Sequence, residues 1–464
     1  MRARRIVVLG GGVAGLGTAL LLARDGHRVT VVDRDPLEPG DPSDSPSWPR
    51  RGIPHFLQPH AFIPRGRVEM MRHLPDVHSA LVDAGADTVD VCRKMPGAER
   101  REGDDDLQYV GVRRPLIEWA LRRAVSEQTG ITAIGQTRAT ALAFDAGLVA
   151  TVLTDGGALD ADVVVDAMGR RSPTPEWLAD VGIDAPAPAT SDCGVVYYSR
   201  YYRLRPGCTL PDGPWPLSPR GDLGYLGFST FPGDNGTFAG LLAVPSGVPA
   251  WRAFKDAPVF EAAVARIPAL HAWTDPDLVE PITDVLAMAG LRNSLRDARG
   301  AVAAGVVPVG DALGQTDPVL AHGLSFALIH ARELTSALRE HDALTDAGTA
   351  YLEAVMPLLS ERFDLATELD EQRHRMWVGG EVDYAHRCGD YALFTTVAGG
   401  ASSAVDADIF RRFYRRIALL ESTKVLDEDV ETQERMERVF AELSALPRPP
   451  AGPTSEEMLA LVSS

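Results

Sequence analysis

The sequence contains few cysteines and few lysines, and both shortages exclude classes of site. Its 464 residues include four cysteines, no two of which form a C-x-x-C pair. This spacing argues against a disulfide framework and against a cysteine-based zinc site. We therefore expect no metal, and reduced thiols in a cytoplasmic protein. Almost all basic residues are arginines, and Lys94 is the one lysine in the first half of the sequence.

Positive charge is also scarce. The chain has 46 lysine and arginine residues against 64 aspartate and glutamate residues, which gives a formal net charge of −18 at pH 7. Nucleic-acid binding needs a basic face that matches the phosphates, so this balance argues against a nucleic-acid partner. The same balance disfavours docking on an anionic lipid surface.

Long uninterrupted hydrophobic runs are absent too. Residues 6–23 carry no charge and follow a basic start, as in a signal peptide, but five glycines interrupt the run. Charged residues follow it, with no small-residue cleavage site. We therefore expect the start of a folded domain here, and neither an export signal nor a membrane span.

This uncharged run has the pattern of a dinucleotide-binding unit: strand 5–9, a glycine turn, helix 16–24 and strand 28–32. Gly10 permits the tight turn, and Gly12 lets the backbone approach a pyrophosphate at the positive end of the helix. Asp33, eighteen residues after Gly15, is placed to accept hydrogen bonds from ribose hydroxyls. The cofactor-binding residues predicted here are Gly10, Gly12, Val13, Ala14, Gly15, Asp33 and Arg34.

Two further segments select FAD over NAD. We expect a strand over 301–309, then Gly310-Asp311, a loop over 312–318 and a helix from about Ala321 to Leu338. This resembles the second FAD fingerprint of glutathione-reductase-type flavoproteins, which implies that Asp311 holds the ribitol and that the helix aims its positive end at the flavin. Strand 162–165 would return the chain to the FAD domain, with its exit loop near the adenosine half. The predicted cofactor-binding residues of these segments are Asp166, Gly169, Gly310, Asp311, Pro318, His322, Gly323 and Leu324.

Further motifs make the sequence similar to flavin-dependent epoxidases of polyether antibiotic pathways and to styrene-monooxygenase-like enzymes. The matching residues are Gly52, Pro54, His60, Arg114-Pro115-Leu116, Asp166-Ala167, Gly169-Arg170, Ser172, Gly310-Asp311, Leu313, Pro318, His322-Gly323 and Ser325. By this resemblance Arg114 contacts the FAD pyrophosphate. The sequence departs from the family pattern at Met168, Asp317 and Ala321, where the family has Thr, Asn and Gly.

The expected fold is α/β: a Rossmann-like FAD-binding domain with an inserted antiparallel-sheet substrate domain and a helical C-terminal region. We place the FAD-binding domain at 1–175, with a helical insertion at about 60–110, and at 291–345. The substrate domain spans 176–290 and the helical region 346–464, where a capping box is expected at Thr454. A second dinucleotide motif is lacking, so electrons would come from transiently docked NAD(P)H or from a partner flavin reductase.

The resemblance implies an FAD-dependent monooxygenase. It would use O2, through a flavin C4a-hydroperoxide, to epoxidise or hydroxylate an apolar or aromatic small molecule in secondary metabolism. His322 and His60 are the candidate catalytic residues beside the flavin. Tyr197, Ser199 and Tyr201 share one face of a predicted strand over 193–204 and are the candidate substrate-binding residues.

Three alternatives stay open. The same fold supports an FAD-dependent dehydrogenase or prenyl-type reductase, which oxygen use would distinguish. A flavin-dependent halogenase is disfavoured because no W-x-W-x-I-P segment is present and because the sequence around Lys94 does not match the expected lysine site. The third is a flavin-binding protein without catalytic activity.

Overall fold

A five-stranded parallel sheet with the order β18-β9-β1-β2-β5 forms the centre of the N-terminal part of the molecule. Its strands are Arg5–Leu9 (β1), Arg28–Val32 (β2), Ile131–Ile134 (β5), Val163–Asp166 (β9) and Val306–Pro308 (β18). The apolar β-branched residues of β1, β9 and β18 are buried, as parallel strands between helices require, whereas those of edge strand β5 are half-buried. The structure is a computed structural model that describes residues 3–97, 99–211, 219–447 and 450–463.

Helices from distant parts of the sequence pack around this sheet. They are α1 (Val13–Arg24), α4 (Arg114–Glu127) and α9 (Gly323–Glu340), and α1 contacts both of the others. Their apolar side chains belong to one large hydrophobic core. An antiparallel sheet of β6 (Ala139–Asp145), β7 (Leu148–Thr154) and β8 (Gly157–Asp160) connects β5 to β9. Short α5 (Thr174–Ala179) follows β9.

The insertion between β2 and α4 is only partly helical. It contains α2 (Pro64–His73) and α3 (Pro75–Asp83), each with a proline at its first position. An antiparallel pair, β3 (Asp87–Asp90) and β4 (Gln108–Gly111), follows. The expected helical insertion at 60–110 is therefore a helix pair with a small hairpin.

A second, antiparallel sheet forms the other half of the molecule, with the order β12-β13-β14-β11-β15. Its strands are Arg220–Asp222 (β12), Gly227–Pro232 (β13), Thr237–Pro245 (β14), Val195–Leu204 (β11) and Val279–Pro281 (β15), and β16 (Leu286–Met288) also pairs with β11. Helices α6 (Ala257–Ala265) and α7 (Pro268–Thr274) share a hydrophobic cluster with Tyr198 of β11. Tyr198 and the side chains in phase with it therefore face these helices.

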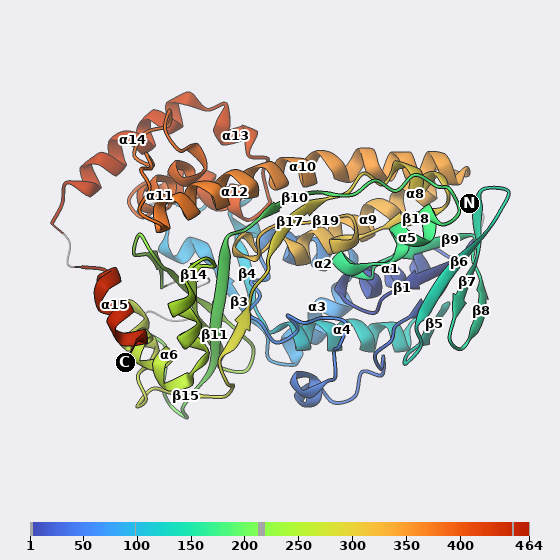
Figure 1. The fold of residues 1–464 in the computed structure, drawn as a ribbon, viewed down its shortest axis with the longest axis horizontal. Coiled ribbons are helices and arrows are strands. Elements are labelled where there is room, and N and C mark those ends of the chain that lie inside the picture. Colours follow the sequence, from blue (N-terminus) through green and yellow to red (C-terminus); the bar gives the residue numbers. More distant parts are fainter. Residues whose placement is uncertain (1–2, 98, 212–218, 448–449, 464) are drawn as a thin grey trace.

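Two strands connect the halves, as Figure 1 shows: β10 (Ala189–Asp192) runs into β11, and β17 (Arg292–Leu295) leads back toward α8 and β18. They pair antiparallel, and β19 (Gly314–Gln315) joins them. This ribbon brings the loop after β19 to the beginning of β11.

The C-terminal region is helical, with α10 (Leu344–Trp377), α11 (Tyr391–Ser403), α12 (Ala407–Ile417), α13 (Lys424–Asp427), α14 (Val430–Ser444) and α15 (Ser455–Val462). The last helix lies beside α6 (Figure 1), where Met458 is buried in the α6–α7 cluster. The expected capping box is present, with Thr454 and Glu457 as partners. No described helix is both long enough and apolar enough to cross a membrane.

The expected α/β fold class with its inserted antiparallel sheet and helical C-terminal region is confirmed. Two local predictions were wrong. Residues 301–309 are not one strand: α8 covers Arg299–Ala303, and Gly305 with φ of +77° separates it from β18. The alanine-rich start of this segment favours helix, which its apolar composition obscured. The sequence also predicts a helix over 404–420 within the helical region. The observed helix is shorter, because Asp406 caps the start of α12 by accepting from the backbone N–H groups of Asp408 and Ile409.

Candidate functional site

The glycine loop after β1 packs so tightly against backbone carbonyl groups that two of its positions cannot carry a side chain. Gly10 has φ of +107°, and a Cβ there would lie 2.5 Å from the carbonyl oxygen of Ala167. A Cβ at Gly15 would lie 1.9 Å from the carbonyl oxygen of Gly10. Val13, which begins α1, is buried, and Ala14 is half-buried. The backbone N–H groups at the start of α1 therefore face outward from a tight glycine turn.

The three segments expected at the cofactor do meet at this loop. Besides the Gly10–Ala167 contact, a Cβ at Gly310 would lie 2.9 Å from Cβ of Ala14. A Cβ at Gly169 would lie 4.0 Å from Cβ of Asp311, so the exit loop of β9 touches the turn after β18. Residues separated by about three hundred positions in the sequence thus surround one edge of the parallel sheet.

Two of the expected cofactor-binding carboxylates are already hydrogen-bonded within the protein. Asp33 accepts from the backbone N–H of Gly11 at 2.5 Å and from that of Asp35 at 2.7 Å. Asp166 accepts from the Ser172 hydroxyl at 2.6 Å and from the backbone N–H of Met168 at 3.1 Å. Through these hydrogen bonds both carboxylates stabilise the loops around the site. The role of direct cofactor ligand stays a prediction for each, and Arg34 beside Asp33 is exposed.

Arg114 lies at the glycine loop with its guanidinium fixed on two sides. Nε donates to Oε1 of Glu118 at 2.9 Å, and NH1 donates to Nε2 of His55 at 2.9 Å. The remaining nitrogen, NH2, lies 3.8 Å from the position that a Cβ on Gly12 would take. One donor group of Arg114 is therefore directed at the loop where the sequence predicts a pyrophosphate.

The two histidines beside Arg114 are neutral. His60 donates from Nδ1 to the carbonyl oxygen of Gln58 at 2.7 Å, which leaves Nε2 as an acceptor 3.5 Å from NH1 of Arg114. Burial and the nearby Arg114 charge lower the pKa of His60 to about 3 and that of His55 to about 2. His60 can therefore accept a hydrogen bond here but is not a proton-carrying acid near neutral pH. His55 was not predicted from the sequence, because it has no motif of its own beyond its place in the Gly52–His60 segment.

A buried network of ion pairs lies next to the glycine loop and stabilises it. Arg50 forms ion pairs with Asp33 at 3.3 Å, with Asp35 at 3.2 Å and with Glu118 at 2.9 Å. Its NH2 also donates to the carbonyl oxygen of Gly11 at 3.0 Å. Arg122 completes the network, so that three arginines face three carboxylates: Arg50, Arg114 and Arg122 face Asp33, Asp35 and Glu118. Sequence reasoning did not find Arg50 or Glu118, because burial of a charged residue is not visible from its neighbours in the sequence.

Asp311 lies between two arginines. Burial raises the pKa of its carboxyl group, while the charges of Arg114 and Arg170 act in the opposite direction. Unlike Asp33 and Asp166, it has no side-chain hydrogen bond to another described residue. Asp311 is half-buried at the edge of the protein, so its carboxylate is open to a donor from a ligand, and a polyol hydroxyl is a suitable one.

The loop that begins at Asp317 leads into α9 and presents a small exposed surface. Pro318, Val319 and Gly323 are exposed, whereas Leu324 is buried. Ala321 adopts the left-handed conformation with φ of +56°, where the family pattern has glycine. The exposed backbone at the start of α9 therefore faces outward, as the flavin position predicted from the sequence requires.

The side chain of His322 is buried, whereas the sequence predicts that it lies beside the flavin. Its ring is buried, packs against Phe326 with centroids 5.7 Å apart, and lies near Arg362 and Arg416 of the helical region. Burial holds the pKa of His322 well below its usual range. The ring is therefore neutral and covered by the C-terminal helices, so the structure gives a catalytic role for His322 no support, and that role stays a prediction.

The candidate substrate residues of β11 face the FAD-binding half, but they do not line an open cavity. Tyr197 donates from its hydroxyl to Oδ1 of Asp317 at 2.6 Å, and Ser199 donates to Oε1 of Gln58 at 2.9 Å. Tyr201 is buried near Arg113. Their exposed fractions are 2%, 0% and 5%, so this face holds the two halves together, and substrate contact stays a prediction.

Two hollows adjoin this region. A small apolar one lies between the helical insertion and β13, lined by His60, Phe62, Val89, Tyr109, Val110 and Phe231 among others. A larger cleft of about 270 Å3 opens beside Asp311 and is rich in arginine: Arg170, Arg171, Arg292 and Arg296. Within the described residues, none of these four forms an ion pair with a carboxylate. The cleft therefore concentrates unbalanced positive charge in an acidic protein.

Known proteins resemble the chain in sequence and in fold. Residues 5–95 match the FAD dependent oxidoreductase family. Protein Rv3254 of Mycobacterium tuberculosis is 24% identical over 470 residues, with 90% of each chain covered. PqsL of Pseudomonas aeruginosa, a probable FAD-dependent monooxygenase, superposes with a TM-score of 0.59 at 18% identity, covering 82% of this chain and 99% of PqsL.

The flavin-dependent brominase Bmp2 superposes with a TM-score of 0.61 at 16% identity, over 94% of this chain and 100% of Bmp2. At such identities the superpositions establish the fold, while the match over residues 5–95 relates the glycine loop to an FAD-dependent family. By its N-terminal segment the chain is thus related to the FAD-dependent oxidoreductases, and its fold is that of FAD-dependent monooxygenases and of a flavin-dependent brominase.

Proposed function

We propose that this protein is an FAD-dependent monooxygenase that inserts one oxygen atom from O2 into an apolar or aromatic small molecule. The observation that carries this proposal is the convergence of the glycine loop, Arg114 and Asp311 at one edge of the parallel sheet. Each group offers what one part of FAD needs: backbone N–H groups and a guanidinium for the pyrophosphate, and a carboxylate for the ribitol.

The residues present fit FAD without rearrangement of the loop. A Cβ at Gly12 would make ordinary contacts with Cδ1 of Ile53 at 3.6 Å and with NH2 of Arg114 at 3.8 Å, so NH2 of Arg114 is directed toward this glycine. Asp311 is a half-buried acceptor without a described side-chain donor, and exposed Pro318, Val319 and Gly323 offer a surface for the flavin ring. When bound there, FAD would supply the electron transfer and the activation of O2, as this cofactor does in monooxygenases.

The chain's own residues would then orient the substrate and keep water away. The small apolar hollow beside His60, lined by side chains such as Phe62 and Phe231, has a volume of about 10 Å3, so an apolar or aromatic substrate would have to widen it. Nε2 of His60 lies 3.5 Å from NH1 of Arg114, and a substrate donor would take the place of that contact, since His60 is neutral and its Nδ1 is already used. Epoxidation, hydroxylation and a place in secondary metabolism all rest on the resemblance to the polyether epoxidases.

The arginine-rich cleft supports NAD(P)H as the electron donor. Its charge is unbalanced within the described residues, and it opens beside Asp311. Phosphate groups of a docked nicotinamide dinucleotide would neutralise this charge, and guanidinium groups suit phosphate oxygens. We therefore favour direct reduction by NAD(P)H over a partner flavin reductase.

A halogenase is the second candidate because Bmp2 matches the fold over 94% of the chain. Lys94 argues against a halogenase, since this side chain is exposed at the end of a short turn in the insertion. An FAD-dependent dehydrogenase is also compatible with the match over residues 5–95.

The test uses the purified full-length chain reconstituted with FAD and supplied with NADPH or NADH. We expect flavin reduction without added reductase, and product from a panel of alkenes and aromatic compounds that carries one atom from isotope-labelled O2. Substrate oxidation without incorporated label would identify a dehydrogenase. Product that appears only with bromide would identify a halogenase.

A further inference from the structure

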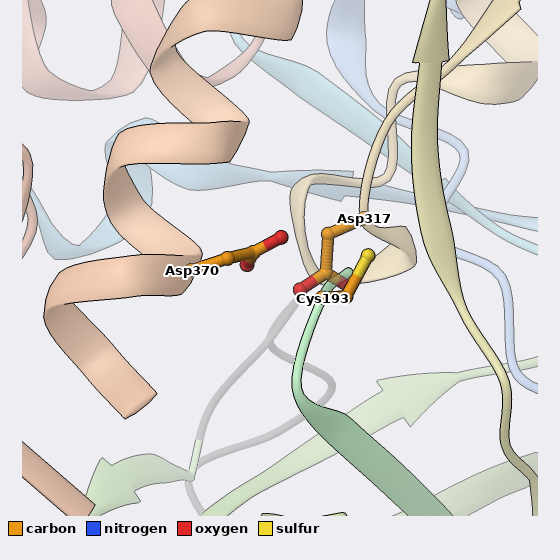
Figure 2. Close-up of side chains that lie close together, drawn as sticks. All are labelled: Cys193, Asp317 and Asp370. Carbon is orange, nitrogen blue, oxygen red and sulfur yellow. The ribbon is translucent and has the colours of Figure 1, made fainter. Parts of the chain in front are cut away.

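Three parts of the molecule meet at one buried group of polar side chains. Asp317 comes from the loop that leads to α9, Cys193 lies just before β11, and Asp370 comes from α10, as Figure 2 shows. Asn293 of β17 joins them by accepting from the backbone N–H of Asp317 at 2.6 Å. This junction therefore links the predicted flavin loop to the substrate half and to the C-terminal helices.

Two carboxylates share a single cation at the junction. One nitrogen, NH2 of Arg373, donates to Oδ2 of Asp317 at 2.7 Å and to Oδ1 of Asp370 at 2.7 Å. All three side chains are buried. If both carboxyl groups were ionised, the group would carry a net negative charge away from water, which is strongly unfavourable.

The hydrogen bonds show which carboxyl group is the ionised one. Asp317 also accepts from the Tyr197 hydroxyl at 2.6 Å and from the backbone N–H of Val319 at 3.0 Å. Asp370 has one further donor, Nδ2 of Asn293 at 2.8 Å. Donors stabilise a carboxylate, so the negative charge resides on Asp317 and a proton remains on Asp370.

Electrostatics agree with this assignment. Burial and the neighbouring Asp317 raise the pKa of Asp370 to about 8. Arg373 holds the pKa of Asp317 below its usual range. The other titratable groups that face the junction are the Cys193 thiol and the Tyr197 phenol, and burial raises the pKa of both. Asp222 is connected through Trp377, whose Nε1 donates to it at 2.9 Å and whose ring lies 5.2 Å from the Arg373 guanidinium.

A metal ion would be another way to neutralise the two carboxylates. Sγ of Cys193 and one oxygen of each carboxyl group lie within 4.8 Å of one another. However, NH2 of Arg373 bonds to both carboxyl groups and so supplies the cation there. The geometry points to a shared proton and not to a metal.

We propose that Asp370 is a positioning residue whose retained proton, shared with Asp317, fixes the flavin-side loop from Asp317 to Leu320 against α10. Loss of this proton would leave two adjacent anions on one guanidinium, and their repulsion would separate the loop from α10. Because the loop is where the flavin ring would lie, FAD affinity would then depend on this proton. The link to FAD rests on the proposed function, whereas the shared proton does not.

The first experiment measures the proton directly in the full-length chain without FAD. Infrared spectroscopy at neutral pH should show the C=O stretch of a buried protonated carboxyl group. This band should be absent in Asp370→Asn and should disappear in the wild type with a midpoint near pH 8. The matched control is Asp364→Asn, since Asp364 is exposed on the same helix and its substitution should leave the band unchanged. A spectrum without the band, or a band that persists in Asp370→Asn, would overturn the proposal.

The second experiment measures the dissociation constant of FAD by flavin fluorescence between pH 6.5 and 9.5. In the wild type and in Asp364→Asn, affinity should fall above pH 8 by up to about tenfold per pH unit, because one proton is linked to binding. Asp370→Asn keeps a neutral side chain and should show a flat profile.

Equal pH profiles in Asp370→Asn and wild type would refute the coupling to the flavin loop. An absence of FAD binding at every pH, together with an intact infrared band, would refute the proposed function and the coupling while the shared proton stands. Stoichiometric zinc in the purified protein that is lost in Asp370→Asn would show a metal site instead.

Discussion

Glu118 is fully buried and holds Arg114, four residues before it on α4, through a hydrogen bond from Nε at 2.9 Å. The other carboxylate oxygen forms an ion pair with Arg50 at 2.9 Å. One carboxylate therefore sets the direction of Arg114 and also anchors the segment that contains Arg50. This arrangement makes Glu118 as important for the site as the arginine that faces the glycine loop.

Substitution Glu118→Gln removes one charge of a buried ionic network. We expect a loss of about 3 kcal/mol in the free energy of unfolding, because a buried ion pair that loses one partner leaves an uncompensated charge. FAD affinity should fall as well, since Arg114 loses its orientation. Urea unfolding and flavin fluorescence measure the two effects. Glu127→Gln, at an exposed position of the same helix, should change neither, and equal effects of both substitutions would contradict this role.

The histidines near Arg114 predict acid sensitivity. The pKa of His55 is about 2 in the folded protein, below its value in the unfolded chain, so the unfolded state binds the proton first as the pH falls. Stability is therefore complete above about pH 6.5 and declines below it. Between pH 7 and pH 5 the wild type should lose about 2 kcal/mol more than His55→Gln. Urea unfolding at both pH values measures this difference, and exposed His271→Gln should behave like the wild type.

The arginine-rich cleft predicts a specific defect in electron supply. Arg292→Glu reverses one charge at its exposed rim, so the KM for NAD(P)H in flavin reduction should rise at least about tenfold. The dissociation constant of FAD should change little, because Arg292 lies outside the glycine loop. Stopped-flow reduction measures the first quantity and fluorescence the second. Arg203→Glu, at an exposed position of β11, is the matched charge reversal, and an equal KM change in both variants would argue against docking in the cleft.

Tyr197→Phe tests whether this residue holds the junction or binds substrate. Its hydroxyl donates to a buried carboxylate, so its removal should reduce the free energy of unfolding by about 2 kcal/mol. It should also shift the pH midpoint at Asp370, because Asp317 loses a donor. Tyr202→Phe removes a similar bond to Glu261 on the opposite face and should leave that midpoint unchanged. A raised substrate KM with unchanged stability and midpoint would instead support the substrate role.

The sequence predicted those parts of the molecule whose structure follows local rules. The glycine turn, the strands on either side and the capping box at Thr454 depend on residues within a few positions of one another. The convergence of the segments around Gly10, Ala167 and Gly310 was predicted only because family resemblance related distant motifs. Residues 301–309 were predicted wrongly, because an alanine-rich apolar segment is compatible with either helix or strand.

The parts that could not be predicted depend on contacts between distant residues. Tyr197 and Asp317 are 120 positions apart, and Asp317 and Arg373 are 56 positions apart. A single sequence does not reveal that such polar residues share a buried site. The same limit explains why the sequence did not reveal that the Tyr197 hydroxyl donates to a carboxylate.

The ion-pair network beside the glycine loop contains as many positive as negative charges, and this balance affects how nucleotide binding depends on salt concentration. Three arginines and three carboxylates cancel there, whereas the neighbouring cleft holds four arginines that form no ion pair within the described residues. Binding at a balanced, buried site is only weakly screened, while attraction to an exposed surplus of charge is screened within about a nanometre at physiological ionic strength. The two nucleotides would therefore respond differently to ionic strength: the resident flavin would stay bound in concentrated salt, and docking of the reductant would weaken.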